Sequence, residues 1–405
     1  MKIGIITHHF ASNFGANIQT MSTIEYIKKA GHTPIIVNWT NNTLVADYKK
    51  SIPNSQYIEH KVFADNYYPL SEICVSKEDM ARVIEKEGIE AIIIGSDAVV
   101  QHHPFITRIA FPTRRVISFH KFTEDRLFPN FFWGDFLPYL KKKIPMAYMS
   151  VSCQNSPYHY IVGKTRRLMR DACSKFNFIS VRDSWTKKMF VHLNPVYESI
   201  RITPDPVFAL NNNAGKLLHD RETILKKFNL PEKYFLISFF KGDKEYTKWV
   251  RDFATLVKQD GTEPYMFPFP NGTFDMPGIK KIDIPLSPID WYCLIKYSSG
   301  FVGRNMHPIV VCLHNQVPFF SFDQYGTKIL NSICVQSSSK IYDILSRANL
   351  LEYRATSTGL FQQRPTPNEV YKKIGTFDVE QCKVFTERQY NAYLEMMKAI
   401  LASFR

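Results

Sequence analysis

The chain of 405 residues lacks any run of about 18 uncharged apolar residues, the length that a membrane-spanning helix needs. Its N-terminal apolar stretch, within residues 1–7, is too short for a signal peptide and is expected to enter a β-strand directly. These two absences predict a cytoplasmic protein without a transmembrane helix.

Cysteine is present, but it lacks the spacing of a structural site. The seven cysteines are odd in number, scattered, and never arranged as C-x-x-C, which argues against a disulfide framework and a zinc site. The turn after the first predicted strand also lacks the G-x-G-x-x-G fingerprint of dinucleotide binding. We therefore expect buried thiols and no bound metal.

The formal net charge of +14 is the strongest compositional signal, and no recognisable nucleic-acid-binding motif accompanies it. The basic residues are dispersed, and their densest clusters, residues 141–143 and 164–170, fit helix faces. A basic surface suits acidic small substrates or an anionic membrane. We therefore predict an anionic substrate, attraction to a membrane surface and no nucleic-acid partner; a merely soluble basic face is the alternative.

The N-terminal segment, up to about residue 39, has a sequence pattern typical of an α/β half-domain. An apolar strand over residues 2–7 is followed by a polar turn, by a helix with isoleucine and methionine at three-residue spacing, and by a second strand over residues 34–39. The turn contains His8, Asn13 and Gly15. Their position directly after the first strand favours ligand contacts over a role in turn formation alone.

Further polar residues follow later strands. Asp97 ends the strand that begins at residue 91, Arg182 follows the strand 178–181, and Asp205 lies between two prolines that hold the chain extended. The carboxyl edge of a parallel sheet is where ligands of α/β proteins bind. Capping for the aspartates and a surface ion pair for the arginine are the alternatives.

The stretch 299–320 is the clearest candidate site. A short strand ends at Gly303, Arg304 and His307 follow, and Pro308 suits the first turn of an apolar helix. A cation and an imidazole beside a helix N-terminus make an anion site. The alternative is that His307 only caps the helix and that Arg304 is solvated.

The strand–helix alternation restarts in the second half, so we place a domain boundary just beyond Asp205-Pro206. The chain is then divided into an N-terminal domain over residues 1–206, a C-terminal domain over 207–379, and a terminal helix over 380–405 that could return to the first domain. Residues 40–75 are predicted to be irregular. Residues 101–143, aromatic and basic without clear periodicity, are predicted to form a functional loop for acceptor recognition near a membrane, not core.

Several short motifs resemble, in their order and spacing, those of the polysaccharide pyruvyl transferase family. They are Asn13-Phe-Gly-Ala-Asn-Ile-Gln19, Ile94-Gly-Ser-Asp97, Ser180-Val-Arg-Asp-Ser184, Asp205-Pro206, and Asn305-Met-His307 with Val317-Pro-Phe-Phe320 behind it. The resemblance implies two Rossmann-like domains facing a cleft, the glycosyltransferase B-like architecture. It also implies transfer of the pyruvyl group of phosphoenolpyruvate, as a ketal, to a sugar of a surface polysaccharide or its lipid-linked precursor, without metal or organic cofactor.

The resemblance also implies roles for individual residues. His307 and Asp97 are the expected catalytic residues, and Asp205 and His8 the expected acceptor contacts. Expected donor contacts are Arg182, Arg304, Asn305, Asn13 and Gly15. The chain departs from the family in one turn, because Asn305 stands where many members have Arg or Ser. Arg304 lies one position earlier, which in an extended turn points it to the other face.

The sequence is also compatible with two other functions. A glycosyltransferase of the same architecture, with a nucleotide-sugar donor, would explain the basic charge equally well, although the second half shows no clear acidic pair for a nucleotide ribose. A non-catalytic scaffold in polysaccharide synthesis is the third. The expected partners are phosphoenolpyruvate, a glycan or lipid-linked sugar, the inner membrane surface, and a second copy of the chain.

Overall fold

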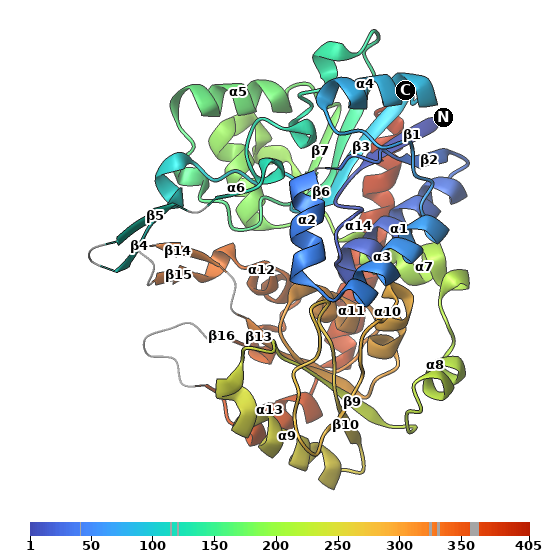
Figure 1. Cartoon of the computed structure of the whole chain (residues 1–405), viewed down its shortest axis with the longest axis vertical. Helices are drawn as coiled ribbons and strands as arrows, with labels where there is room; N and C mark the ends of the chain where they lie inside the picture. The colour runs from blue at the N-terminus through green and yellow to red at the C-terminus, as the bar shows by residue number, and fades with distance from the viewer. Residues whose placement is uncertain (41, 114–115, 120, 324–325, 330–332, 357–363) are drawn as a thin grey trace.

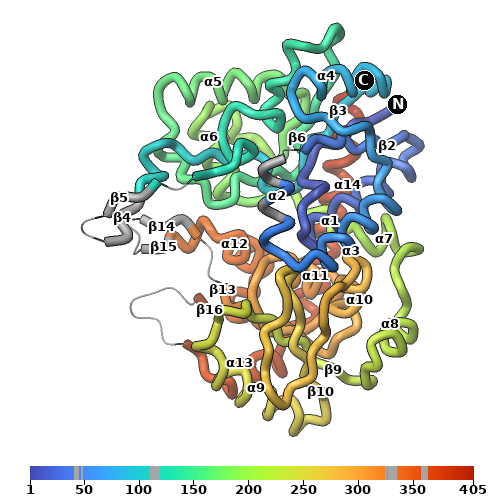
Figure 2. The backbone as a smooth tube through the Cα atoms, in the orientation of Figure 1, coloured from blue at the N-terminus to red at the C-terminus, as the bar shows by residue number. Residues whose placement is uncertain are grey.

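The computed structural model describes residues 1–40, 42–113, 116–119, 121–323, 326–329, 333–356 and 364–405. Two six-stranded sheets form the cores of two domains, which lie one above the other in Figure 1. The N- and C-termini both lie in the upper domain, as Figure 2 shows. In the described ranges, no helix combines the length and apolar character needed to cross a bilayer.

The first sheet has the strand order β2-β1-β3-β6-β7-β8, and all neighbouring strands are parallel. Its strands are β1 (Lys2–Ile6), β2 (Thr33–Ile36), β3 (Ala91–Asp97), β6 (Met146–Val151), β7 (Phe178–Val181) and β8 (Arg201–Ile202). Ile93 faces one hydrophobic core and Ile92 and Ile94 face another, which explains the continuous apolar sequence of β3. The order reverses at β1 and β3, the position where such sheets bind ligands.

The second sheet has the order β11-β10-β9-β12-β13-β16, again with parallel neighbours. Its strands are β9 (Tyr234–Ser238), β10 (Glu263–Met266), β11 (Lys280–Lys281), β12 (Gly300–Gly303), β13 (Phe319–Asp323) and β16 (Arg354–Thr356). Here the order reverses between β9 and β12, so the turn after β12 lies at the second switch point.

The helices of the first domain are α1 (Phe14–Lys29), α2 (Asn42–Ser51), α3 (Asn54–Tyr67), α4 (Lys77–Glu87), α5 (Gly163–Cys173) and α6 (Ser184–Leu193). Those that follow are α7 (Leu210–Ala214), α8 (Arg221–Lys227), α9 (Thr247–Gln259), α10 (Pro288–Lys296), α11 (Met306–His314), α12 (Lys340–Arg347), α13 (Pro367–Gly375) and α14 (Val379–Ala402). Two antiparallel strand pairs, β4 (Ile109–Thr113) with β5 (Val116–Phe119) and β14 (Thr327–Ile329) with β15 (Ile333–Val335), lie outside the two large sheets.

Helix α1 is buried on almost every side over its first three turns, from Phe14 to Ile24. The sequence predicts a helix with one apolar side, and the difference arises because the second domain covers the other side. The ring of Phe14 stacks on that of Trp291 in α10, with ring centroids 5.4 Å apart. Helix α1 therefore belongs to the interface between the domains, with its N-terminus at their junction.

Helix α14 connects the two domains a second time. Near its start, Thr386 Oγ1 donates a hydrogen bond to the carbonyl of Leu313 in α11 at 2.8 Å. Near its end, Met396 Sδ accepts one from Ser150 Oγ, in β6 of the first sheet, at 3.2 Å. The last helix thus returns to the domain in which the chain begins.

Two predicted irregular regions are ordered in the structure, and both differences have a tertiary cause. Residues 42–67 form α2 and α3, where Gln56 and His60 face other protein groups instead of solvent. Within 101–143, the prediction of loop without core is wrong for Phe132, Trp133 and Phe136. These rings are at most 1% exposed and fill the core beside β6. Neither burial pattern follows a local periodicity, so the sequence alone did not show it.

Candidate functional site

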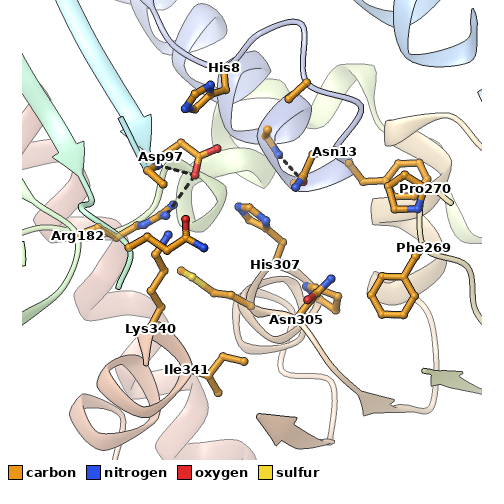
Figure 3. Close-up of a pocket in the computed structure, with 18 of the residues that line it drawn as sticks. His8, Asn13, Asp97, Arg182, Phe269, Pro270, Asn305, His307, Lys340 and Ile341 are labelled. Carbon is orange, nitrogen blue, oxygen red and sulfur yellow. Dashed lines mark hydrogen bonds and ion pairs between the residues drawn. The ribbon is translucent and has the colours of Figure 1, made fainter. Parts of the chain in front are cut away.

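A cavity of about 340 Å³ lies between the carboxyl edges of the two sheets. The turns after β1 and β3 line it from the first domain, and the turn after β12 and the start of α12 line it from the second. Figure 3 shows Arg182, Asp97, His307 and Lys340 converging on one side of it, with Phe269 and Pro270 on the other. The two switch points of the sheets thus meet in one cavity.

Three helices begin at this cavity. The lining includes the first residues of α1, of α11 and of α12, at Asn13–Ala16, Asn305–Pro308 and Ser338–Ile341. The N-terminal N–H groups of a helix lack intrahelical acceptors, and the helix dipole adds positive potential there. Three N-termini aimed at one space favour negatively charged ligands.

Arg182 is held beneath the cavity by two carboxylates. Its Nη1 donates to Asp205 Oδ2 at 2.8 Å and its Nη2 to Asp97 Oδ1 at 3.4 Å, and the guanidinium side chain is 3% exposed. Burial opposes the ionisation of Asp97, but Arg182 and then His8 outweigh it and hold the pKa of Asp97 well below its usual value. Asp97 is therefore a permanent anion at physiological pH.

His307 reaches across the domain interface and lies on the backbone of Gly15. A Cβ atom at Gly15 would be 2.0 Å from His307 Cγ, so only glycine allows this approach. His307 Nε2 is 4.0 Å from Asp205 Oδ2 and has no hydrogen-bond partner among the residues that the structure describes. Burial lowers the pKa of His307, although Asp205 and Asp97 act in the opposite direction. The imidazole is therefore neutral at pH 7 and can accept a proton.

Several residues of the cavity have backbone conformations that L-amino acids rarely adopt. Asp97 has φ of 112°, Asn305 of 75° and Gln154 of 54°, and all three line the cavity. Such conformations persist only where the surrounding structure enforces them, and they concentrate at functional sites. The strain at the ends of β3 and β12 thus supports the assignment of this cavity as the functional site.

The structure gathers most of the predicted site residues in one place. The seven that line the cavity are His8, Asn13, Gly15, Asp97, Arg182, Asn305 and His307. Asn13 also caps α1, because its side chain accepts a hydrogen bond from the N–H of Ala16 at 3.2 Å.

Asp205 is not part of the cavity lining. It is 2% exposed and lies behind Arg182. One of its oxygens accepts from Arg182 and the other from the N–H of Val207 at 3.0 Å. Both oxygens of Asp205 thus hold Arg182 and the following turn, and its role as an acceptor contact stays a prediction.

Arg304 also departs from its predicted place. Its Nη1 donates to Asp243 Oδ1 at 3.0 Å, and the guanidinium lies over the ring of Tyr246, 4.8 Å from the centroid. The side chain is 1% exposed and is absent from the cavity lining. Because successive side chains at the end of a strand point to opposite faces, Asn305 turns toward the cavity and Arg304 turns into the second domain. The structure therefore places Arg304 away from the cavity, and its contact with a donor stays a prediction.

Lys340 is the cavity residue that the sequence reasoning missed. It is the first residue of α12 and lines the cavity close to Arg182. Burial, reinforced by the charge of Arg182, lowers the pKa of Lys340 to about 8. One signal was available: a lysine in the first turn of a helix opposes the helix dipole, and the three serines before it mark that helix start.

Comparisons with known proteins agree on the fold and the family. The family model for polysaccharide pyruvyl transferase matches residues 13–324. The UDP-N-acetylglucosamine 2-epimerase of Rickettsia bellii is 12% identical, with a TM-score of 0.52 over 99% of this chain and 96% of that one. The UDP-GlcNAc 2-epimerase of Neisseria meningitidis, bound to UDP-GlcNAc, is 11% identical, with a TM-score of 0.51 over 99% of this chain and 100% of that one.

At these identities the similarity shows the fold alone. It confirms the predicted α/β architecture of two Rossmann-like domains facing a cleft, as in glycosyltransferase B enzymes. No curated protein sequence matches the chain.

Proposed function

Because the chain belongs to the polysaccharide pyruvyl transferase family, we propose that it transfers the pyruvyl group of phosphoenolpyruvate to a sugar of a surface polysaccharide or its lipid-linked precursor. The observation that carries this proposal is the cavity where three helix N-termini, Arg182 and Lys340 surround one space. Phosphoenolpyruvate carries a phosphate and a carboxylate, and both need positive potential and N–H donors.

The proposed reaction joins two sugar hydroxyls to one donor carbon. A proton adds to the methylene carbon of the donor, one hydroxyl oxygen attacks the neighbouring carbon, and the C–O bond to phosphate breaks. The second hydroxyl then attacks the same carbon and closes the ketal. The two hydroxyl protons end on the new methyl group and on the released phosphate, so the reaction needs no oxidant or reductant.

Two side chains of the cavity suit these steps. The neutral imidazole of His307 can take the proton of an attacking hydroxyl. The permanently ionised Asp97, held by Arg182, lies where it can stabilise the positive charge that develops on the donor carbon as phosphate leaves. Both groups face the same cavity from opposite domains.

A calorimetric titration tests whether phosphoenolpyruvate is the donor. Purified protein should bind phosphoenolpyruvate in the micromolar-to-millimolar range by calorimetry. With a glycan acceptor it should release inorganic phosphate and retain a pyruvyl group on the sugar, which mass spectrometry detects. Binding of a nucleotide sugar instead of phosphoenolpyruvate would favour the glycosyltransferase reading. Absence of any donor turnover across a panel of acceptors would favour the scaffold.

We also propose that the surface around α5 contacts an anionic membrane, where a lipid-linked acceptor would be found. Tyr160, Val162 and Leu168 are 54%, 63% and 46% exposed, and the exposed side chains of Lys164 and Arg167 lie among them. Apolar side chains interleaved with basic ones are the composition of surfaces that rest in the headgroup region of anionic bilayers.

Vesicle sedimentation tests this surface. The protein should bind phosphatidylglycerol vesicles more strongly than phosphatidylcholine vesicles, and serine at Tyr160, Val162 and Leu168 together should weaken that binding about tenfold or more. Val196→Ser, at a residue 66% exposed elsewhere on the surface, is the matched control. Equal binding of the triple variant and the wild type would contradict the proposal.

A further inference from the structure

Lys340 is a cation that lines the cavity. In the part of the chain that the structure describes, no Asp or Glu oxygen lies within ion-pair distance of its Nζ, although the cavity is lined by both domains. We propose that Lys340, together with the first turn of α12, binds one acidic group of the ligand. The identity of that ligand as phosphoenolpyruvate rests on the proposed function, whereas the anion site itself does not.

The charges around the cavity show why Arg182 alone does not supply enough positive charge to bind a ligand with two acidic groups. Among the described lining residues, the arginine and lysine side chains are Arg126, Arg182 and Lys340. Four carboxylates lie in or beside this lining: Asp97 and Asp125 are part of it, Asp205 lies behind Arg182, and the charge of Asp183 acts on both Arg182 and Lys340. With the histidines left out of the count, three cations face four carboxylates, and without Lys340 the sum would be more negative still. A donor with two acidic groups would then be repelled.

The hydrogen bonds of Arg182 lead to the same conclusion. Its Nη1 and Nη2 are occupied by Asp205 and Asp97, which leaves Nε as its buried nitrogen without a hydrogen-bond partner. Because Nη1 and Nη2 each form an ion pair with a protein carboxylate, the positive charge of Arg182 is already offset before a ligand binds. Lys340, which lines the same cavity, supplies the missing positive charge.

The start of α12 adds donors beside this charge. Ser339 caps the helix by accepting from the N–H of Tyr342 at 3.3 Å, and its hydroxyl donates to Asp323. The N–H groups of Lys340 and Ile341 have no acceptor in the described chain, and both residues line the cavity. A lysine in this first turn is unfavourable unless an anion is bound there, because both the lysine and the helix dipole are positive.

Burial of Lys340 also links ligand binding to pH. The groups that face it are Arg182, which opposes its charge, and Asp97, Asp183 and the Cys153 thiol, which favour it. Since the pKa of Lys340 is about 8 in the unliganded protein, the lysine loses its proton just above neutral pH. An anion that requires charged Lys340 should therefore bind more weakly as the pH rises from 7.5 to 9.

Calorimetry on two variants tests the inference, with phosphoenolpyruvate, inorganic phosphate and pyruvate as probes. Lys340→Met should weaken phosphoenolpyruvate binding about 10- to 100-fold, the effect of removing a charged hydrogen-bond donor. Lys340→Arg should retain most of the affinity and lose the decline between pH 7.5 and 9. Lys226→Met, which removes an exposed charge in α8, is the matched control and should bind as the wild type does.

The probes separate the possible outcomes. Weakened phosphate binding in Lys340→Met assigns the phosphate to Lys340, and weakened pyruvate binding assigns the carboxylate. If the wild type binds phosphate but not phosphoenolpyruvate, the proposed function fails while the anion site stands. Equal affinities of Lys340→Met and the wild type for every probe, or binding of no probe by the wild type, would overturn the inference.

Discussion

Replacing His307 with glutamine is expected to lower turnover about 10²- to 10⁴-fold, the usual contribution of a general acid or base. Donor affinity should change much less, because the neutral imidazole contributes no charge to the anion site. Steady-state kinetics with a glycan acceptor, combined with calorimetric titration of phosphoenolpyruvate, separates the two effects. A variant that loses donor binding and turnover equally would instead make His307 a donor contact.

Gly15→Ala supplies an independent variant that acts on the same imidazole. The added methyl would overlap the ring of His307, which must move away from its place over α1. Turnover should fall although His307 itself is intact. Gly375→Ala, which adds the same methyl group at the end of α13 where nothing lies within 4 Å of it, is the control. Full activity of Gly15→Ala would show that the observed position of the ring is not needed for catalysis.

The pH profile provides a third readout of His307. Burial lowers its pKa below the usual value of about 6.5, so the imidazole is neutral above that range and becomes protonated as the pH falls. Only the neutral imidazole can accept a proton. The wild-type rate should therefore decline as the pH falls through the pKa of His307. His307→Gln should lose this decline along with most of its rate.

Replacing Arg182 with methionine is expected to lower the free energy of unfolding by about 3–5 kcal/mol, as measured by urea denaturation. The pair is buried, with side chains of Arg182 and Asp205 only 3% and 1% exposed, so removal of the guanidinium leaves a buried carboxylate without its counter-ion. Asp97 loses its partner in the same step.

The double variant Arg182→Met with Asp205→Asn distinguishes an unpaired charge from a packing defect. The amide carries no charge, so the double variant should recover part of the lost stability. Arg170→Met, at an exposed ion pair in α5, is the control and should change stability by less than about 1 kcal/mol. A double variant less stable than Arg182→Met would contradict the explanation.

Much of the site could be predicted from sequence because one geometric rule connects distant segments. Apolar strands that end in His8, Asp97, Arg182 and the turn at Asn305 must bring those residues to the carboxyl edges of two parallel sheets. The rule predicts which edge each residue occupies, and the structure shows these residues lining one cavity.

The remaining features depend on contacts that no local pattern records. The approach of His307 to Gly15 joins two domains, and the sequence of neither turn determines the docking of the other. The ion pair of Arg304 with Asp243 joins residues that are 61 positions apart in the chain. Lys340 follows a stretch without strong periodicity, so its distance from the sheet edge could not be counted along the chain. The positions of His307, Arg304 and Lys340 therefore all depend on tertiary contacts between distant parts of the chain.

The return of α14 to the first sheet has a consequence for how the protein is made. Ser150 and Tyr26, in the first domain, pack against Met396 and Tyr393 of the last helix, and Met396, Met397 and Ile400 belong to a core that includes Ile3. A ribosome adds about 5–20 residues per second, so the first sheet is complete on the order of ten seconds or more before α14 emerges. During that time one face of the sheet lacks its final cover. The domain synthesised first is therefore completed last, and cutting the chain after β8, the last strand of the first sheet, would not release a domain with its native core.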